Sequence, residues 1–184
     1  MRIASQGILN QDKEITFYFD SKPYKGFLGD TVASALLAND VHLVGRSFKY
    51  HRPRGILGIG SEEPNALISV HKGGRVEPNV RATVQEIYQG LIVTSQNSWP
   101  NLKFDALAIN DIAARFLSAG FYYKTFMWPP RFWEALYEPI IRRAAGLGRL
   151  DSKTDDDNYD QNFLFCDLLI IGGGPSGLLS ALLT

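Results

Sequence analysis

Cysteine is almost missing from this sequence. Cys166 is the only cysteine among 184 residues, so the chain cannot form an intramolecular disulfide. A zinc site or an iron–sulfur cluster held by several thiolates of this chain is excluded for the same reason, because such centres use up to four cysteines. So little cysteine is typical of proteins in the reducing cytoplasm, which is the location we expect.

The sequence also lacks an excess of either charge and lacks long apolar runs. Lysine and arginine number 19, as do aspartate and glutamate, so the net charge gives no reason to expect a nucleic-acid partner or an anionic membrane. The N-terminal residues have no apolar core of a signal peptide, and no apolar run approaches the ~18 residues of a membrane span. We therefore expect a soluble protein that is not secreted.

No pattern of catalytic or metal-binding residues can be found in the sequence. The three histidines, His42, His51 and His71, do not have the spacing of metal ligands, and we predict no metal site. Neither a Ser-His-Asp set nor a pair of carboxylates can be argued without a fold to bring residues together. The catalytic residues stay unassigned for that reason.

The N-terminal part has the pattern of a small α+β domain. Ile15, Phe17 and Phe19 alternate with polar or aromatic neighbours, which predicts a strand over 14–19, and a turn leads to a return strand over 23–27. Thr31 is a suitable N-cap for a helix over 32–38, and a third strand is expected over 41–44. Hairpin, helix and strand in this order open a β-grasp, ferredoxin-like domain, which we place at residues 1–98. Short strands are expected at 67–70 and 80–84, and the type of the apolar segment 87–93 stays open.

A glycine-rich basic loop covers residues 45–60. Its basic side chains could hold a phosphate, for example that of a flavin, because guanidinium groups pair well with phosphate oxygens. The alternative is an exposed loop or a loop that contacts another subunit. The residues concerned are Arg46, Lys49, His51, Arg52 and Arg54.

Aromatic residues are concentrated between 121 and 137, where eight of the 22 aromatics lie within 17 residues. Such a run belongs in a domain core or a subunit interface, or it lines a substrate or flavin cavity. A helix is expected over 131–145, with Pro139 kinking or splitting it. We interpret 99–150 as an aromatic-rich connector or interface segment and the aspartate-rich residues 151–162 as a linker. The eight aromatics are Phe121, Tyr122, Tyr123, Phe126, Trp128, Phe132, Trp133 and Tyr137.

Residues 163–184 have the pattern of the start of a Rossmann-like domain that binds FAD or NAD(P). An expected strand over 166–171 is followed by a GxGxxG loop and by an apolar helix. Glycines in such a loop allow a tight turn, close approach to a pyrophosphate and close helix packing, and the helix N-terminus faces the anion. We assign NAD to this loop, with FAD as the alternative. The candidate cofactor-binding residues are Gly172, Gly173, Gly174, Pro175, Ser176 and Gly177.

Two features of this segment qualify its expected function. Only seven residues follow Gly177, whereas a ribose-binding acidic residue would lie ~20 residues after the loop, so we expect a truncated domain that binds a dinucleotide weakly by itself. Cys166 could be a redox thiol, but at the start of a buried strand it is expected to be a small structural hydrophobe.

Several long segments resemble one known family. They include GDTVASALLANDVHLVGRSFKYHRPRGI, EPNVRATVQEIYQGL, AGFYYKTFMWPPRFWEALYEPIIRRAAGLGRL and CDLLIIGGGPSGL. Together they are similar to the α subunits of bacterial heterotetrameric sarcosine oxidases, of which this chain would be an N-terminal fragment. The resemblance implies a flavoprotein complex with β, γ and δ subunits that oxidises sarcosine to glycine and releases hydrogen peroxide.

The resemblance also implies a distribution of cofactors. FAD and FMN belong to the complex, NAD to the α subunit, and tetrahydrofolate to a C-terminal domain that lies outside this sequence. The one-carbon unit leaves as formaldehyde or as methylene-tetrahydrofolate. Related amine dehydrogenases carry cluster cysteines in the loop equivalent to Gly45–Glu63, and this chain has none there, so we expect a β-grasp domain with no 2Fe–2S cluster.

Two other functions are left open. One is a subunit of a related secondary-amine dehydrogenase, of the opine or proline type, or of a cyanide synthase. The other is an assembly or binding module that completes no cofactor site, whose basic loop and aromatic surface dock a partner.

Overall fold

The computed structural model describes residues 9–112, 114, 120, 128–144, 148, 151–154 and 158–184. The chain divides into two compact units, Met1–Thr154 and Asp155–Thr184, and the boundary falls inside the linker predicted at 151–162. Among the described residues, no helix combines the length and the apolar character needed to cross a lipid bilayer.

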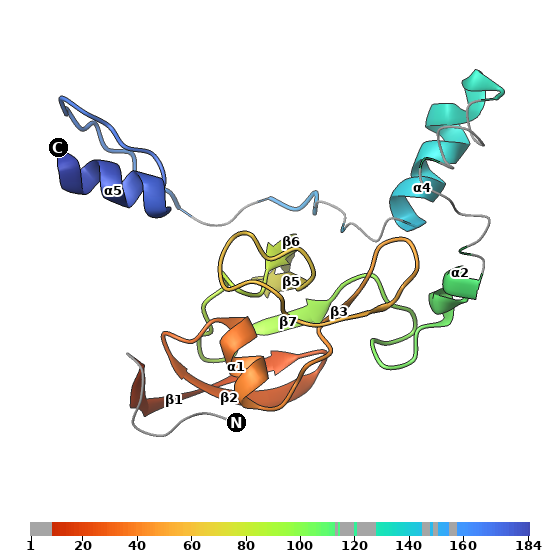
Figure 1. Ribbon diagram of the computed structural model, residues 1–184, viewed down its shortest axis with the longest axis horizontal. Helices are drawn as coiled ribbons and strands as arrows, with labels where there is room; N and C mark the ends of the chain where they lie inside the picture. The colour runs from red at the N-terminus through yellow and green to blue at the C-terminus, as the bar shows by residue number, and fades with distance from the viewer. Residues whose placement is uncertain are drawn as a thin grey trace. The chain divides into compact units, whose positions relative to one another are not determined.

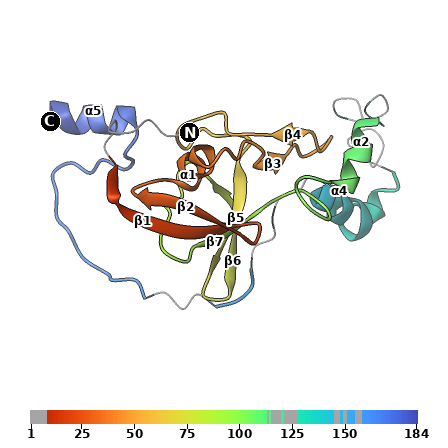
Figure 2. The ribbon, with the colours of Figure 1, turned by 90° about the horizontal axis from the view of Figure 1, so that it is seen from below.

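The first unit is built around a mixed five-stranded sheet (Figures 1 and 2). The order of its strands is β2-β1-β7-β5-β6, and β7 runs parallel to β1 while the other neighbours are antiparallel. These strands are β1 (Asn10–Phe19), β2 (Lys22–Leu28), β5 (Leu67–Lys72), β6 (Arg75–Arg81) and β7 (Ile92–Ser95). A separate short ladder joins β3 (Gly45–Arg46) to β4 (Pro53–Arg54).

The predicted hairpin is confirmed, because the alternating pattern buries one face of β1. Ile15, Phe17 and Phe19 are buried, as the period of two requires. The turn residues Asp20 and Ser21 have φ values of 48° and 64°, which suit the right-handed twist of a two-residue hairpin.

The helix α1 (Val32–Ala38) has the predicted bounds and packs on the β1–β2 hairpin (Figure 1). Thr31 and Ser34 form a reciprocal capping box at its start, in which each side chain accepts the backbone N–H of the other. At Gly26 of β2 the helix comes close: a Cβ there would lie 3.1 Å from Ala35 Cβ and 2.5 Å from Ile87 Cδ1. The core therefore forms between the apolar faces of the helix and the sheet.

The strand predicted at 41–44 is wrong, the one at 80–84 is corrected in part, and the segment 87–93, whose type was left open, is settled by the structure. Residues 41–44 form no strand, because Val41 N donates to Leu36 O and Val44 N to Arg54 O, so their backbone bonds belong to a helix end and a loop. The strand expected at 80–84 is β6, which ends at Arg81. The ambiguous segment 87–93 supplies only the start of β7.

The segments after the sheet are short and helical. They are η1 (Ala106–Ala108), α2 (Ile109–Ile112), η3 (Pro130–Phe132), the π-helix η4 (Trp133–Tyr137) and α4 (Glu138–Ala144). The helix expected over 131–145 is thus divided into η3, η4 and α4, in keeping with the prediction that Pro139 would kink or split it. Proline has no N–H to donate to the preceding turn, and it occupies the second position of α4, where none is needed.

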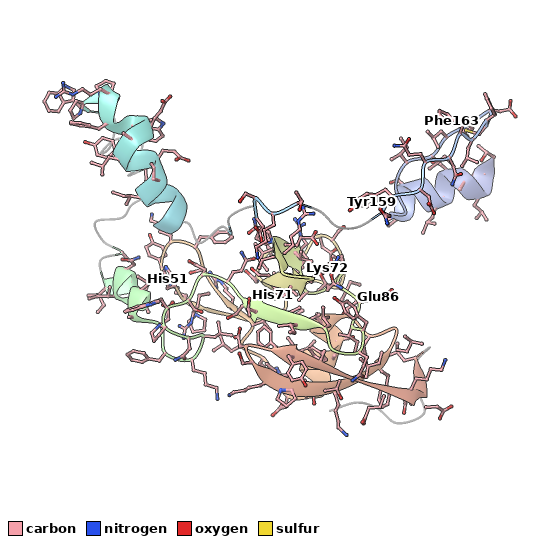
Figure 3. All side chains as sticks on the ribbon, turned by 180° about the vertical axis from the view of Figure 1, so that it is seen from behind. His51, His71, Lys72, Glu86, Tyr159 and Phe163 are labelled. Carbon is pink, nitrogen blue, oxygen red and sulfur yellow. The ribbon has the colours of Figure 1, made fainter. Side chains whose placement is uncertain are left out.

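The second unit contains the helix α5 (Pro175–Leu183) but not the predicted strand over 166–171. A strand requires a hydrogen-bonded neighbour, and the described residues provide none for this segment. Cys166 is consequently exposed, so the expectation of a buried structural cysteine is wrong for this chain. Phe163, shown in Figure 3, is 92% exposed.

Candidate functional site

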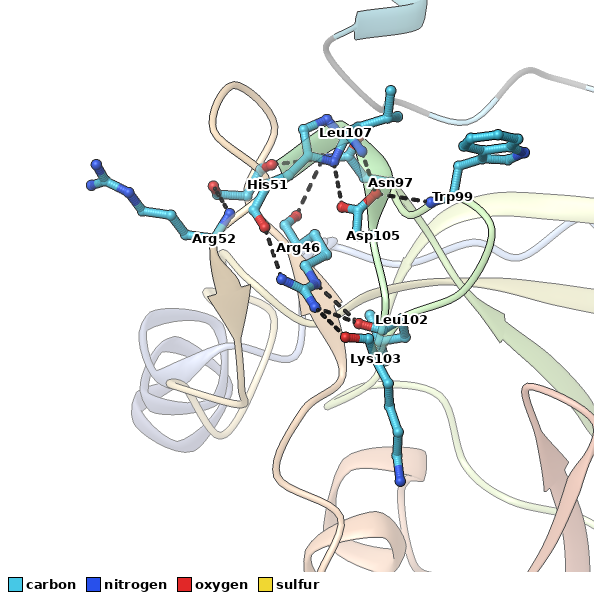
Figure 4. A network of polar contacts seen from close by, with 10 residues as sticks. Arg46, His51, Arg52, Asn97, Trp99, Leu102, Lys103, Asp105 and Leu107 are labelled. Carbon is cyan, nitrogen blue, oxygen red and sulfur yellow. Dashed lines mark hydrogen bonds and ion pairs between the residues drawn. The ribbon is translucent and has the colours of Figure 1, made fainter. Parts of the chain in front are cut away.

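Two of the five basic side chains of the loop 45–60, those of Arg46 and His51, make contacts inside the domain. Arg46, on β3, donates from Nε and Nη2 to the backbone oxygen of Leu102 at 3.0 and 2.7 Å. It donates further to the backbone oxygens of Lys103 at 3.0 Å and His51 at 3.1 Å (Figure 4). This guanidinium therefore ties the loop to the segment after β7 and is not turned toward a phosphate.

His51 forms a buried pair with Asp105. The two residues are 54 positions apart, and His51 Nδ1 lies 2.7 Å from Asp105 Oδ2 with both side chains almost completely buried. The other carboxylate oxygen, Oδ1, accepts the backbone N–H groups of Trp99 at 3.0 Å and Leu107 at 3.1 Å (Figure 4). The pair is thus a structural junction of two loops.

Arg52 and Arg54, the remaining arginines of the loop, lie near the surface. Arg52 pairs with Asp111 at 2.7 Å, and this hydrogen bond and charge raise the pKa of the guanidinium. Arg54 lies in β4 and lines a cavity of about 170 Å³ together with Arg46, Phe48 and Asn97. Ligand cavities typically measure about 300–1,000 Å³, so this one is too small for a flavin. The geometry therefore does not favour a flavin phosphate site at the basic loop: Arg52 and Arg54 are exposed, as the alternative expected, and Arg46 has contacts inside the domain.

A second feature of this region was not recognised from the sequence. Glu63 is completely buried, and its carboxylate accepts four backbone N–H groups of the loop 57–66. Burial opposes its ionisation, but these amides together hold the pKa of the carboxyl below its ordinary value of 4.5. The glycine-rich run that ends in Gly60, followed after Ser61 by two glutamates, was the only signal available in the sequence.

Within the described ranges, no three His, Cys, Asp or Glu side chains gather closely enough to hold a metal ion. His71, which lies on β5 and is labelled in Figure 3, forms a hydrogen bond with Thr94 Oγ1 at 3.1 Å.

The glycine loop of the second unit has an open backbone. Gly174 caps α5 without a side-chain bond, and Gly172 has a φ of +118°. A Cβ at Gly172, Gly173 or Gly174 would meet nothing within 4 Å, whereas one at Gly177 would collide with the Gly172 carbonyl oxygen. Gly177 is therefore required for the close approach of turn and helix. The N–H groups of Ser176 and Gly177, in the first turn of α5, have no acceptor within the helix, as an anion site at a helix N-terminus needs.

None of the four described aromatic residues of the 121–137 run is buried: Trp128 and Phe132 are exposed, and Trp133 and Tyr137 are half-buried. Trp128 is 80% exposed, and Tyr137 contacts Phe132 edge-on and donates its hydroxyl to Trp128 O. A core position is therefore wrong for Trp128, and a role at a subunit interface stays a prediction. Phe121, Tyr122, Tyr123 and Phe126 lie outside the described residues.

Comparison with protein families identifies the first domain. Residues 12–98 match the family model of the 2Fe–2S iron-sulfur cluster binding domain, which agrees with the ferredoxin-like α+β fold. A 2Fe–2S centre of this kind needs four cysteine thiolates, and residues 12–98 contain no cysteine. The residues of this domain therefore do not fit the cluster for which the family is named.

Comparison with individual proteins extends the match along the chain. The sarcosine oxidase subunit alpha of Rhizobium meliloti (strain 1021) is 58% identical over 181 residues, which cover 98% of this chain and 18% of that protein. The subunit alpha of Corynebacterium sp. (strain U-96) is 31% identical, and that of Corynebacterium sp. (strain P-1) 30%, each over 94% of this chain and 13% of the relative.

A solved structure with partial similarity is the L-proline dehydrogenase from P. horikoshii, at 22% identity and a TM-score of 0.39, covering 52% of this chain and 18% of that one. The chain spans less than a fifth of the length of the sarcosine oxidase subunits that it matches. Along nearly its whole length, the chain is homologous to the alpha subunits of sarcosine oxidase.

Proposed function

We propose that the chain is the N-terminal part of the alpha subunit of a heterotetrameric sarcosine oxidase. The observation that supports this most strongly is the 58% identity over 98% of the chain to one such subunit. The proposed reaction converts sarcosine, oxygen and water into glycine, formaldehyde and hydrogen peroxide, with methylene-tetrahydrofolate as the product when folate accepts the one-carbon unit. The location proposed is the cytoplasm, in keeping with a single cysteine.

The reacting groups of this enzyme would lie outside the chain. FAD and FMN are proposed cofactors of the assembled complex with β, γ and δ subunits, and tetrahydrofolate would bind a later domain of the alpha subunit. No residue of the chain is assigned to the oxidation of the amine. Its ferredoxin-like domain would serve as a scaffold without a 2Fe–2S cluster, which agrees with the lack of cysteine in residues 12–98.

The contribution of the second unit would be a dinucleotide site at residues 172–177. When bound, NAD would bring a nicotinamide that can exchange a hydride. The open backbone at Gly172 and Gly174 leaves room for a pyrophosphate, and the amides at the start of α5 would donate to its oxygens. FAD could use the same loop, because its pyrophosphate presents the same oxygens.

The test uses the intact alpha subunit that contains this chain, assembled with its partner subunits. We expect peroxide release with sarcosine at a kcat/KM at least about tenfold above that with proline or an opine, since the site would be built for the N-methyl amino acid. Equal or greater activity with proline or an opine would favour the secondary-amine dehydrogenase. The absence of amine oxidation in an assembled, flavin-loaded complex would favour the assembly module.

A further inference from the structure

The loop 57–66 is organised around a buried carboxylate of its own. Glu63 Oε2 accepts the backbone N–H groups of Leu57 at 2.7 Å and of Gly58. Its Oε1 accepts those of Asn65 at 2.7 Å and Ala66 at 3.1 Å. Converging amides of this kind stabilise the negative charge that burial would otherwise make costly.

Such a ring of amides is an anion-binding arrangement. Turns whose successive N–H groups point inward hold phosphates and iron–sulfur clusters in many proteins. Here the anion inside the turn is the side chain of the turn itself. The domain nevertheless matches the family of 2Fe–2S domains over residues 12–98, so the loop lies in a fold that otherwise carries a cluster.

The spacing of residues around the Glu63 carboxylate agrees with that of cluster ligands in 2Fe–2S domains. Plant-type ferredoxins space three of their cluster cysteines as C-x4-C-x2-C. The same spacing, begun at Gly58, falls on Gly58, Glu63 and Ala66. Glu63 supplies the carboxylate, and Gly58 and Ala66 supply two of the four amides that donate to it.

Two residues from the end of β6 and just beyond it, Thr83 and Arg81, also bond to the loop 57–66. Thr83 is 6% exposed, and its Oγ1 donates to Gly60 O at 2.6 Å. Arg81 Nε further donates to the backbone oxygen of Glu63 at 3.2 Å, which holds the loop against the sheet.

We propose that the Glu63 carboxylate occupies the position of a 2Fe–2S cluster, so that the loop keeps an amide nest of the cluster-binding type and fills it with its own anion. This inference rests on the proposal that the domain has no cluster. It explains how a loop of this family keeps its shape without a metal centre to organise it.

The experiment compares Glu63→Gln with Glu62→Gln in the full chain. Glu62 is a matched control, because its Oε1 also accepts two loop amides, those of Ile59 and Gly60 at 2.9 and 3.0 Å, but Glu62 is exposed. We expect Glu63→Gln to lower the Tm by roughly 5–15 °C, whereas Glu62→Gln leaves it nearly unchanged. Amide exchange at Gly58 and Ala66 should accelerate about tenfold or more in the Glu63 variant alone.

Incubation of the wild-type chain with iron and sulfide distinguishes a failure of the proposal that the domain has no cluster from a failure of the Glu63 inference. Wild-type chain that takes up iron and acid-labile sulfide overturns the proposal of a domain without a cluster, and the Glu63 inference with it. If the wild type takes up neither and Glu63→Gln behaves like Glu62→Gln, the Glu63 inference alone is overturned.

A measurement on the unaltered protein covers the case in which Glu63→Gln does not fold. In a pH titration followed by NMR, the amide signals of Leu57, Gly58, Asn65 and Ala66 should shift together with one midpoint, because all four donate to the Glu63 carboxylate. Separate midpoints for the four amides, or no shift, would overturn the inference.

Discussion

Removal of the Asp105 carboxylate should destabilise the first domain strongly. The side chain of Asp105 is fully buried and has three partners: His51 Nδ1 at 2.7 Å, Trp99 N at 3.0 Å and Leu107 N at 3.1 Å. Hydrogen bonds to a charged group contribute about 1.5–3 kcal/mol each, and a buried group left without its partner costs more than a lost contact. Because the contributions of the three hydrogen bonds are not additive, we expect Asp105→Ala to lower the free energy of unfolding by about 4 kcal/mol.

Urea unfolding followed by circular dichroism measures this change, with Asp111→Ala as the control. Asp111 also pairs with a side chain of the basic loop, Arg52 at 2.7 Å, but both groups are about half exposed, so water replaces the lost partner. Asp105→Asn should lie between wild type and Asp105→Ala, because its amide oxygen can still accept the Trp99 and Leu107 amides. If Asp105→Ala shifts the midpoint no more than Asp111→Ala does, the junction is not the stabilising feature that we describe.

Three further predictions concern acid stability, packing and the glycine loop. The pKa of the Glu63 carboxyl is lowered in the folded state, so its ionised form stabilises the fold fully above pH 4.5 and loses this effect as the pH falls through the folded pKa. The difference in the free energy of unfolding between wild type and Glu63→Gln should therefore shrink in acid. Unfolding curves at pH 7 and pH 3 check this, and an unchanged difference contradicts it. Gly26→Ala should cost about 1–3 kcal/mol in urea unfolding, because the new Cβ would lie 2.5 Å from Ile87 Cδ1. Gly177→Val in the intact alpha subunit should weaken NAD binding by about tenfold or more in calorimetry, because the turn must move away from the helix.

Gly73, which has open surroundings, provides the control for these substitutions. It has a φ of +53° and a Cβ there would meet nothing within 4 Å, so Gly73→Ala carries only a backbone cost of about 1 kcal/mol. Gly73→Val lies outside the glycine loop 172–177 and should leave NAD affinity close to wild type. A larger loss of stability at Gly73 than at Gly26, or equal NAD affinities for the Gly177 and Gly73 variants, would show that the close contacts do not decide these effects.

The sequence by itself determined the local features of this protein. Alternation in β1, the Thr31 cap of α1 and the effect of Pro139 were predictable because each depends on residues within a few positions of one another. The lack of cysteine in residues 12–98 and the long matching segments also required no structure. They indicated a ferredoxin-like domain whose residues do not fit a cluster.

Only the tertiary structure decided which side chains meet and which strands pair. The parallel pairing of β1 with β7, the inward turn of Arg46 and the His51–Asp105 pair join residues more than 50 positions apart, and no local pattern encodes such distances. Residues 166–171 have a strand pattern but form no strand, because a strand depends on a neighbour to complete its hydrogen bonds. Glu63 reads in the sequence as one of two surface glutamates, and it becomes the centre of its loop because the backbone folds four amides around it.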